Sequence, residues 1–206
     1  MKPTVTVTGV GGASAPPDLA VVQVGADCVA RHASEALNEA SAVLGRMRDV
    51  AVEAGVAAAD LATSGMQLWP DHDKDGRPNG YRAALSMTVR VRDLAAATEL
   101  VPALVAAGGD AGRLHSTTLV HSDPAGLAAA ARDNAFADAR QRAEQYAALA
   151  GMSLGEVIAV EESGADGGPV PISAQRWAAP ALAASLPIEA GSDSVTAMVT
   201  VRWRLG

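Results

Sequence analysis

The sequence predicts an α+β protein built on an antiparallel sheet, and two observations support this prediction. Apolar and polar residues alternate along several segments of the 206-residue chain, whereas other segments repeat apolar residues at helical spacing. Between residues 19 and 122 the expected order is strand, helix, strand, strand, helix, strand. This is the split βαβ (βαββαβ-like) order, in which two helices cover one face of an antiparallel sheet. A long helix and two further strands are expected after it.

The first half of the chain supplies the start of this pattern. Val5 and Val7 alternate with threonines, residues 9–17 are rich in turn formers, and Leu19 to Val29 is a second strand candidate. Apolar residues from Ser34 onward recur at helical spacing as far as Gly55, which is suited to end a helix. A hairpin follows, with strands at 61–69 and 83–91 and a polar turn at 70–79.

The second half repeats the alternation of helix and strand. Asp93 can cap a helix, in which Pro102 is expected to cause a kink or an early break. A strand at 113–121 precedes Asp123 and Pro124, which together are a strong helix start. That helix is predicted to end at Gly151, with strands at 154–161 and 195–205 after it.

The segment from Ser163 to Pro187 is too rich in proline for regular strand pairing and is long for a connection inside a compact domain. We expect a functional arm or a disordered loop. We expect large apolar side chains in this arm to form a contact between copies of the chain, with folding of the arm back over its own sheet as the alternative. They are Ile172, Trp177, Leu182 and Leu186.

Composition limits the classes of protein that remain. Hydrophobic residues make up 49% and charged residues 19% of the chain, which favours one domain over residues 1–206 with one core. The net charge of −7 argues against nucleic-acid binding, and a lone cysteine, Cys28, excludes an internal disulfide. We find no export signal and no uninterrupted apolar run long enough to cross a membrane, so a soluble, cytoplasmic protein is expected.

Two glycine and serine patterns resemble catalytic or nucleotide-binding motifs but fail in detail. Gly9, Gly11 and Gly12 follow a strand, yet Ser14 takes the place of the third glycine of a dinucleotide loop and a strand follows instead of a helix. A nucleophile elbow around Ser14 fails because Pro16 replaces its last glycine. We therefore predict that these glycines form a plain turn and bind no cofactor.

The candidate metal ligands are also better explained as surface residues. Asp71, Asp73 and Asp75 imitate the start of a calcium loop, but Arg82 occupies the position that needs a bidentate glutamate. His115 and His121 would lie about 20 Å apart on one strand, which is too far for one ion. Three weaker candidates have similar explanations. His32 and Glu35 form a surface pair on one helical turn, and His72 is a hydrated histidine at the hairpin tip. Asp138 and Glu144 lie on different faces of their helix, so they are not expected to act together as an acid and base.

Several stretches, in this order, resemble the SIMPL-domain family. They are Val5 to Gly11 with Pro17 to Ala20, Gly80 to Ala83, Asn134 to Gly151, and Pro187-Ile188 with Gly191 before the last strand. The resemblance covers nearly the whole chain. It implies an α+β subunit without established enzymatic activity, with relatives that assemble into ring-like homo-oligomers and others linked to oxidative-stress tolerance. Many bacterial relatives are exported, which makes the periplasm or cell envelope the alternative location.

The leading functional expectation is a non-enzymatic, self-associating scaffold or interaction protein. The alternative is a small-ligand-binding protein or an unrecognised enzyme. A pocket with convergent polar groups would favour the alternative, whereas a large apolar surface would favour assembly.

Overall fold

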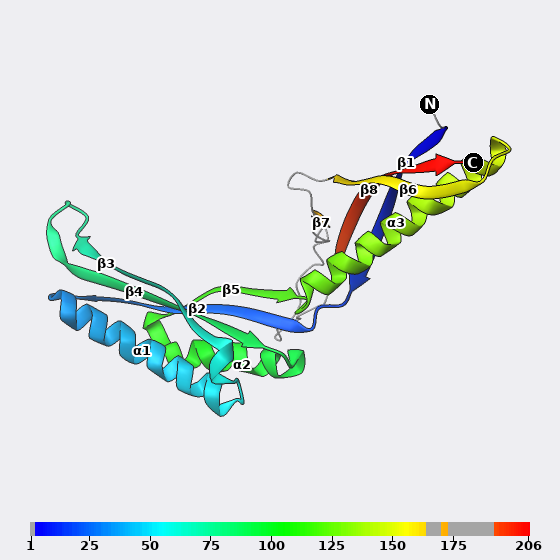
Figure 1. The fold of residues 1–206 in the computed structure, drawn as a ribbon. Helices are drawn as coiled ribbons and strands as arrows, with labels where there is room; N and C mark the ends of the chain where they lie inside the picture. Colours follow the sequence, from blue (N-terminus) through cyan, green and yellow to red (C-terminus); the bar gives the residue numbers. More distant parts are fainter. Residues whose placement is uncertain (1–2, 164–169, 173–191) are drawn as a thin grey trace, which may run out of the picture. The chain divides into compact units, whose positions relative to one another are not determined.

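The computed structural model describes residues 3–163, 170–172 and 192–206, and they form two compact units. Unit 1 contains residues 3–17 together with the described residues from 121 onward, and unit 2 contains residues 18–120. Each unit has an antiparallel sheet with helical cover on one face, as Figure 1 shows. The prediction of an α+β protein is confirmed.

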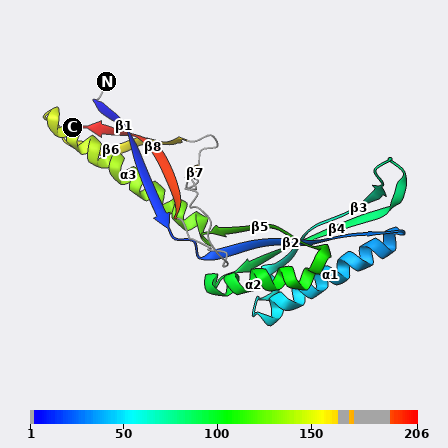
Figure 2. The ribbon, with the colours of Figure 1, turned by 180° about the vertical axis from the view of Figure 1, so that it is seen from behind.

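Unit 2 has the predicted split βαβ topology. Its strands are ordered β3-β4-β2-β5 and every neighbouring pair is antiparallel. Helices α1 and α2 lie on the same face of this sheet in both Figure 1 and Figure 2. The elements are β2 (Leu19–Ala30), α1 (Ala33–Glu53), η1 (Ala58–Asp60), β3 (Leu61–His72), β4 (Pro78–Val91), α2 (Leu94–Gly108), η2 (Gly109–Ala111) and β5 (Gly112–Val120).

The core of unit 2 follows from the alternation of side chains along the two central strands. One face of β2 and β4 is apolar and buried beneath the helices, with Val22, Val24 and Val89 completely inaccessible. Met47 from α1 and Leu104 from α2 fill the space against them. The other face of the sheet has no helix on it within unit 2, and its side chains are mostly polar.

Unit 1 combines the N-terminal strand with the C-terminal half of the chain. Its sheet has the order β1-β8-β6, β7 pairs with β8, and α3 packs against β1 and β8. The long predicted helix is confirmed and begins as expected, since the Asp123 side chain accepts a hydrogen bond from Gly126 N at 2.8 Å. The elements are β1 (Thr4–Ala15), α3 (Pro124–Leu149), β6 (Leu154–Ser163), β7 (Val170–Ile172) and β8 (Asp193–Leu205).

The glycines near the N-terminus form a strand, so the prediction of a turn at residues 9–17 is wrong for most of that range. A Cβ atom on Gly9 or Gly11 would collide with main-chain atoms of α3, at Ala135 and its neighbours. The alanines that line this seam are completely buried. Glycine is therefore required because strand and helix backbones approach closely.

Helix α3 also covers the free edge of β1. Asn134, Asp138 and Arg142 recur every fourth residue and therefore share one face of the helix. The Asn134 amide donates to Gly12 O at 2.8 Å, Asp138 accepts from Val10 N at 2.9 Å, and Arg142 donates to Thr8 O at 3.3 Å. These bonds satisfy main-chain groups that an edge strand otherwise exposes.

Two further expectations differ from the structure. Helix α2 continues through Pro102 to Gly108, so an early break at that proline is wrong. The described residues also contain separate hydrophobic clusters in the two units, where we expected one common core. Whether the units act as a single domain over residues 1–206 stays a prediction.

Helix α2 is strongly apolar. Within the described part of the chain, the stretch Leu94–Ala111 is the one helical candidate for a membrane span by length and composition. Its side chains Leu100, Val101 and Leu104 are buried in the core of unit 2. These buried side chains account for part of its apolar character, since 28% of the stretch is buried and Val105 is 45% exposed.

Candidate functional site

A polar cavity of about 270 Å³ lies on the open face of the unit 2 sheet. The strand register explains its position, because Gly65, Ser86 and Gly25 form one row across β3, β4 and β2. Three small residues side by side leave a depression in a face that otherwise carries longer side chains. The rim is formed by the side chains of Asp27, Gln67, Arg113 and His115.

A β-bulge lies beside the cavity on each edge strand. In β5, Ser116 pairs with Gln23 and Leu114 pairs with Val24, so His115 is the extra residue. In β3, the extra residue is Ser64, immediately before Gly65. Bulges redirect side chains and are frequent next to binding sites. The bulge in β5 places the His115 imidazole over Gly25, where a Cβ atom would be only 2.6 Å from His115 Nε2.

A charged cluster borders the cavity through Asp27. Arg82 Nη1 lies 2.9 Å and 3.1 Å from the two carboxylate oxygens of Asp27, and Arg82 also donates to Asp71 Oδ1 from Nε at 3.2 Å and Nη2 at 3.1 Å. Its hydrogen bonds to Asp71, with the charge of Asp27, raise the pKa of Arg82 above its ordinary value. One guanidinium thus faces two carboxylates, which leaves one negative charge uncompensated within this group.

The opposite rim carries a positive charge. Arg113 Nη1 donates to the carbonyl oxygens of Asp110 and Gly112, both at 2.8 Å, which fixes the guanidinium at the start of β5. Its remaining donors make no hydrogen bond with the described residues. The side chains of His115, Ser86 and Gln67 likewise make none within the part of the chain that is described, so their polar groups remain available in the cavity.

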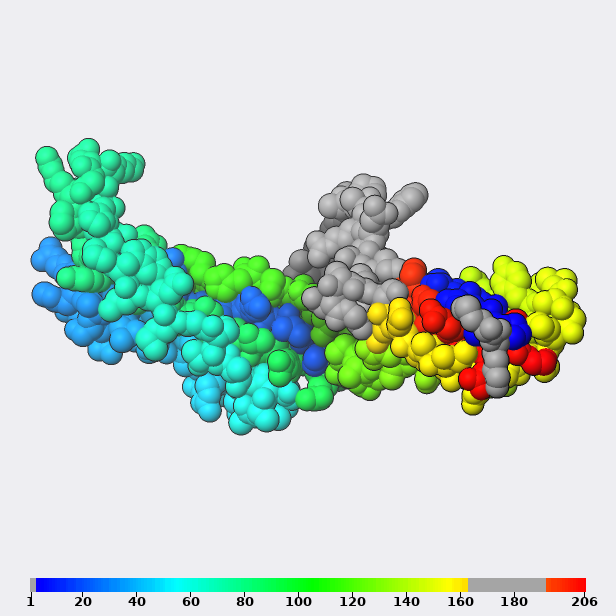
Figure 3. All heavy atoms as spheres, turned by 45° about the horizontal axis from the view of Figure 1, so that its top comes forward, coloured from blue at the N-terminus to red at the C-terminus, as the bar shows by residue number. Residues whose placement is uncertain are grey.

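The acidic residues at the hairpin tip form hydrogen bonds within the hairpin. Asp73 Oδ1 accepts from Asp75 N and Arg77 N, both at 2.9 Å, and the turn closes at Gly76 with a φ of 77°. Asp71 is held by Arg82 and by Asn79. The tip is visible in Figure 3 as the teal projection of unit 2. The absence of a calcium requirement stays a prediction.

The other candidate ligands and nucleophiles do not converge in the described residues. His115 belongs to unit 2 and His121 to unit 1, while His32 precedes α1 and His72 ends β3. Ser14 pairs with Ser194 inside the unit 1 sheet. Asp138 contacts β1, whereas Glu144 pairs with Arg140 at 2.9 Å, so the two carboxylates have separate structural partners as their spacing predicts. No group of three metal-binding side chains occurs among residues 3–163, 170–172 and 192–206.

The predicted oligomer contact in the arm lies outside the described side chains. Ile172 is in β7, where it pairs with Ser194, and its side chain is outside the described part. Trp177, Leu182 and Leu186 also lie outside the described residues.

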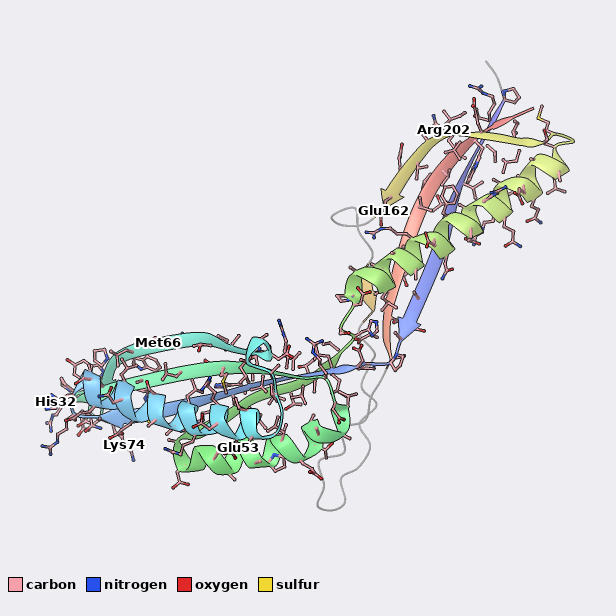
Figure 4. All side chains as sticks on the ribbon, turned by 60° about the horizontal axis from the view of Figure 1, so that its bottom comes forward. His32, Glu53, Met66, Lys74, Glu162 and Arg202 are labelled. Carbon is pink, nitrogen blue, oxygen red and sulfur yellow. The ribbon has the colours of Figure 1, made fainter. Side chains whose placement is uncertain are left out.

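A second candidate surface is the free edge of β3. Met66, Leu68 and Trp69 are 64%, 45% and 38% exposed, although all three are large and apolar. Strand β3 forms one edge of the unit 2 sheet, and Met66 is labelled on it in Figure 4. No charged residue occurs from Leu61 to Pro70. No described side chain forms a hydrogen bond with the main chain of Leu61–Trp69, in contrast to the cover that α3 gives to β1.

Sequence reasoning missed both surfaces for identifiable reasons. Gly25 and Gly65 interrupt strand patterns, which signals a bulge or a close approach, but only the pairing register shows that they are neighbours of Ser86. The role of His115 depends on an extra residue in β5, and single-sequence alternation does not reveal bulges. The edge position of β3 follows from the split βαβ order and could have been predicted.

Nearly the whole chain matches a known protein family. The family model SIMPL, described as a protein of unknown function (DUF541), matches residues 5–203. This chain belongs to the SIMPL family. The resemblance seen in the sequence is thereby confirmed.

The relatives of this SIMPL-family chain include periplasmic proteins. It is 30% identical over 208 residues to the 26 kDa periplasmic immunogenic proteins of Brucella melitensis and Brucella abortus, covering 96% of this chain and 82% of theirs. Among solved structures, AtUAH in complex with (S)-hydroxyglycine is 15% identical with a TM-score of 0.26, over 55% of this chain and 29% of that one. An amidase of the hydantoinase/carbamoylase family from Burkholderia phymatum is 16% identical with a TM-score of 0.28, over 55% and 30%. Structural similarity this low carries no inference.

Proposed function

We propose that this SIMPL-family chain is a non-enzymatic scaffold or interaction protein that assembles with itself through the free edge of β3. The observation that carries the proposal is the combination of an unpaired, uncharged strand edge with exposed apolar side chains on it. Such an edge offers main-chain donors and acceptors to another strand, and natural monomers usually block it with charges, covering side chains or irregularities.

Comparison of the sheet edges favours β3 over the strands of unit 1. Strand β1 is covered by side chains from α3. Strand β6 exposes Val157, Ile158 and Val160 but also carries Glu156, Glu161 and Glu162. Glu156 and Glu162 are paired with Arg204 and Arg132, and desolvation of these ion pairs and of the Glu161 charge would oppose pairing with a second copy. The part of β3 between the bulge at Ser64 and Pro70 has no covering side chains from the described residues and no charged residues.

The residue pattern of β3 suits antiparallel pairing with an identical strand. If Gln67 lies on the two-fold axis, Met66 of one copy is opposite Leu68 of the other, and Gly65 is opposite Trp69. Residues directly opposite in an antiparallel pair share one face, so Met66 and Leu68 from both copies would form one apolar cluster. Pairing would join two four-stranded sheets and bury side chains that are exposed in the single chain.

Multi-angle light scattering of purified full-length chain tests the proposal. We expect a homo-oligomer for the wild type and a smaller species for Met66→Lys, because a charge on the edge opposes burial in the apolar cluster. Val52→Lys is the matched control: Val52 is 45% exposed on α1, so the same change there should leave the mass unaltered. A monomeric wild type, or an oligomer unaffected by Met66→Lys, contradicts the proposal.

The proposal that the protein is not an enzyme is supported by the structural contacts of its candidate reactive side chains. The carboxylates of Asp138 and Glu144 are engaged with β1 and Arg140, and Ser14 lies within a paired strand. A contribution of the arm at 163–187 to assembly, through Ile172, Trp177, Leu182 and Leu186, remains part of the proposal, as does a role in stress tolerance.

We propose that the protein is located in the periplasm. The names of the Brucella relatives support the periplasmic alternative over the cytoplasmic location expected from the sequence. Fractionation of the source cells decides between them: recovery with the osmotic-shock fluid supports the periplasm, and recovery with the cytosol supports the cytoplasm.

A further inference from the structure

We propose that the cavity on the open face of the unit 2 sheet binds a small zwitterion of the free amino-acid class. The ligand carboxylate would contact Arg113 and His115, and its ammonium group would contact Asp27. This inference goes beyond self-association, because Met66 and Leu68 lie on the face opposite the cavity. The proposed pairing would, however, bring the partner's Trp69 opposite Gly65 on the cavity face.

The shape of the cavity indicates a built site. Gly65 and Ser86 form a floor of small residues beside Gly25, which the His115 ring covers, and bulges at Ser64 and His115 interrupt both edge strands at nearly the same level of the sheet. A volume of about 270 Å³ is near the lower limit of ligand pockets, which suits a ligand of metabolite size.

The charges of the rim select the class of ligand. Arg82 is shared between Asp27 and Asp71, so this side keeps a net negative charge. Arg113 on the neighbouring strand supplies a positive charge, and it pairs in register with Gly25, two residues before Asp27. Diagonal neighbours in a sheet are about 7–8 Å apart at Cα, a span that one small molecule can bridge.

Ligands with a single sign of charge match the cavity less well. A phosphate or dicarboxylate would be repelled by Asp27, and a simple amine by Arg113. A molecule with a carboxylate and an ammonium group uses both rims, and Arg113 can hold a carboxylate with two parallel hydrogen bonds. Ser86 and Gln67 remain available for its side chain or a bridging water.

Isothermal titration calorimetry on the full-length chain tests this assignment. The probes are the common L-amino acids, each titrated to about 10 mM, which is sufficient to detect a Kd of about 1 mM. We expect at least one to bind. For that amino acid, the amide that lacks the carboxylate and the N-acetyl derivative that lacks the ammonium should each bind at least about tenfold more weakly, a loss of about 1.4 kcal/mol.

Variants locate the binding. Arg113→Gln and Asp27→Asn should each weaken binding at least about tenfold. Arg90→Gln should leave it unchanged, since Arg90 is an exposed arginine of β4 outside the cavity. Circular dichroism of Arg113→Gln, whose side chain is on the surface, confirms that the fold is kept. The proposal is overturned if no amino acid binds, if the amide or the N-acetyl derivative binds as well as the amino acid itself, or if Arg113→Gln binds like the wild type.

Discussion

Gly11 shows how one hydrogen atom in place of a side chain decides the packing of unit 1. A Cβ atom at this position would overlap main-chain atoms of Ala131 and Ala135 in α3, and neither backbone can move aside alone. We expect Gly11→Ala to lower the free energy of unfolding by about 2–3 kcal/mol. Urea denaturation followed by circular dichroism measures the change.

Gly12 provides the matched control one residue further along β1. A Cβ atom there would lie 3.8 Å from Val195 O, which is an ordinary contact. Gly12→Ala should therefore change stability by less than about 0.5 kcal/mol. Equal losses for the two variants would show that the seam between β1 and α3 is not the reason for glycine at position 11.

Cys28 has a thiol whose acid–base chemistry changes on folding. It is 8% exposed, and burial, with the charges of Glu39 and Asp27, raises the pKa of its thiol. Folding therefore favours the protonated thiol. The contribution of this thiol to the free energy of unfolding is fully present below the unfolded pKa of about 8.5, and it is lost as the pH rises through the folded pKa. Iodoacetamide at neutral pH should modify the urea-unfolded chain much faster than the folded one. Equal rates would contradict a buried thiol.

At the scale of elements, Asp93 illustrates a helix start that the sequence predicts and the structure confirms. Its Oδ1 accepts from Ala95 N at 2.9 Å and Ala96 N at 3.3 Å. Asp93→Ala should cost about 1 kcal/mol of stability. Glu99→Ala, an exposed change within the same helix, should cost little. A thermal denaturation series compares the two, and a larger loss at Glu99 would contradict the capping role.

Most elements were predictable because their signals are local. Helix caps at Asp93 and Asp123 and the alternation in β8 depend on residues close together in sequence. The strand through Gly9 and Gly11 was misread because glycine favours turns, whereas here a distant helix requires it. Pro102 was expected to cause a kink or an early break in α2. The helix does not break there, because it continues to Gly108 with Leu100, Val101 and Leu104 buried in the core. The cavity depended on register and bulges, which a single sequence does not disclose.

At the scale of the whole molecule, the arm between β6 and β8 is a separate test of assembly. Its large apolar residues led to the prediction that it contributes to the contact between copies. Deletion of residues 164–184 should then reduce the oligomer mass measured by light scattering. An oligomer of unchanged subunit number would exclude the arm from the contact and leave the role of β3 untouched.

Disulfide cross-linking at Gln67 tests the central claim of assembly through β3 most directly. On a two-fold axis the two Gln67 Cα atoms would be about 4.5–5.5 Å apart, within the range that a disulfide spans. Gln67→Cys should form covalent dimers under mild oxidation, detected on a non-reducing gel. Thr63→Cys, four residues from the axis, should not, because its two copies would be about 26 Å apart. Efficient dimerisation through Thr63→Cys, or none through Gln67→Cys, would contradict the account.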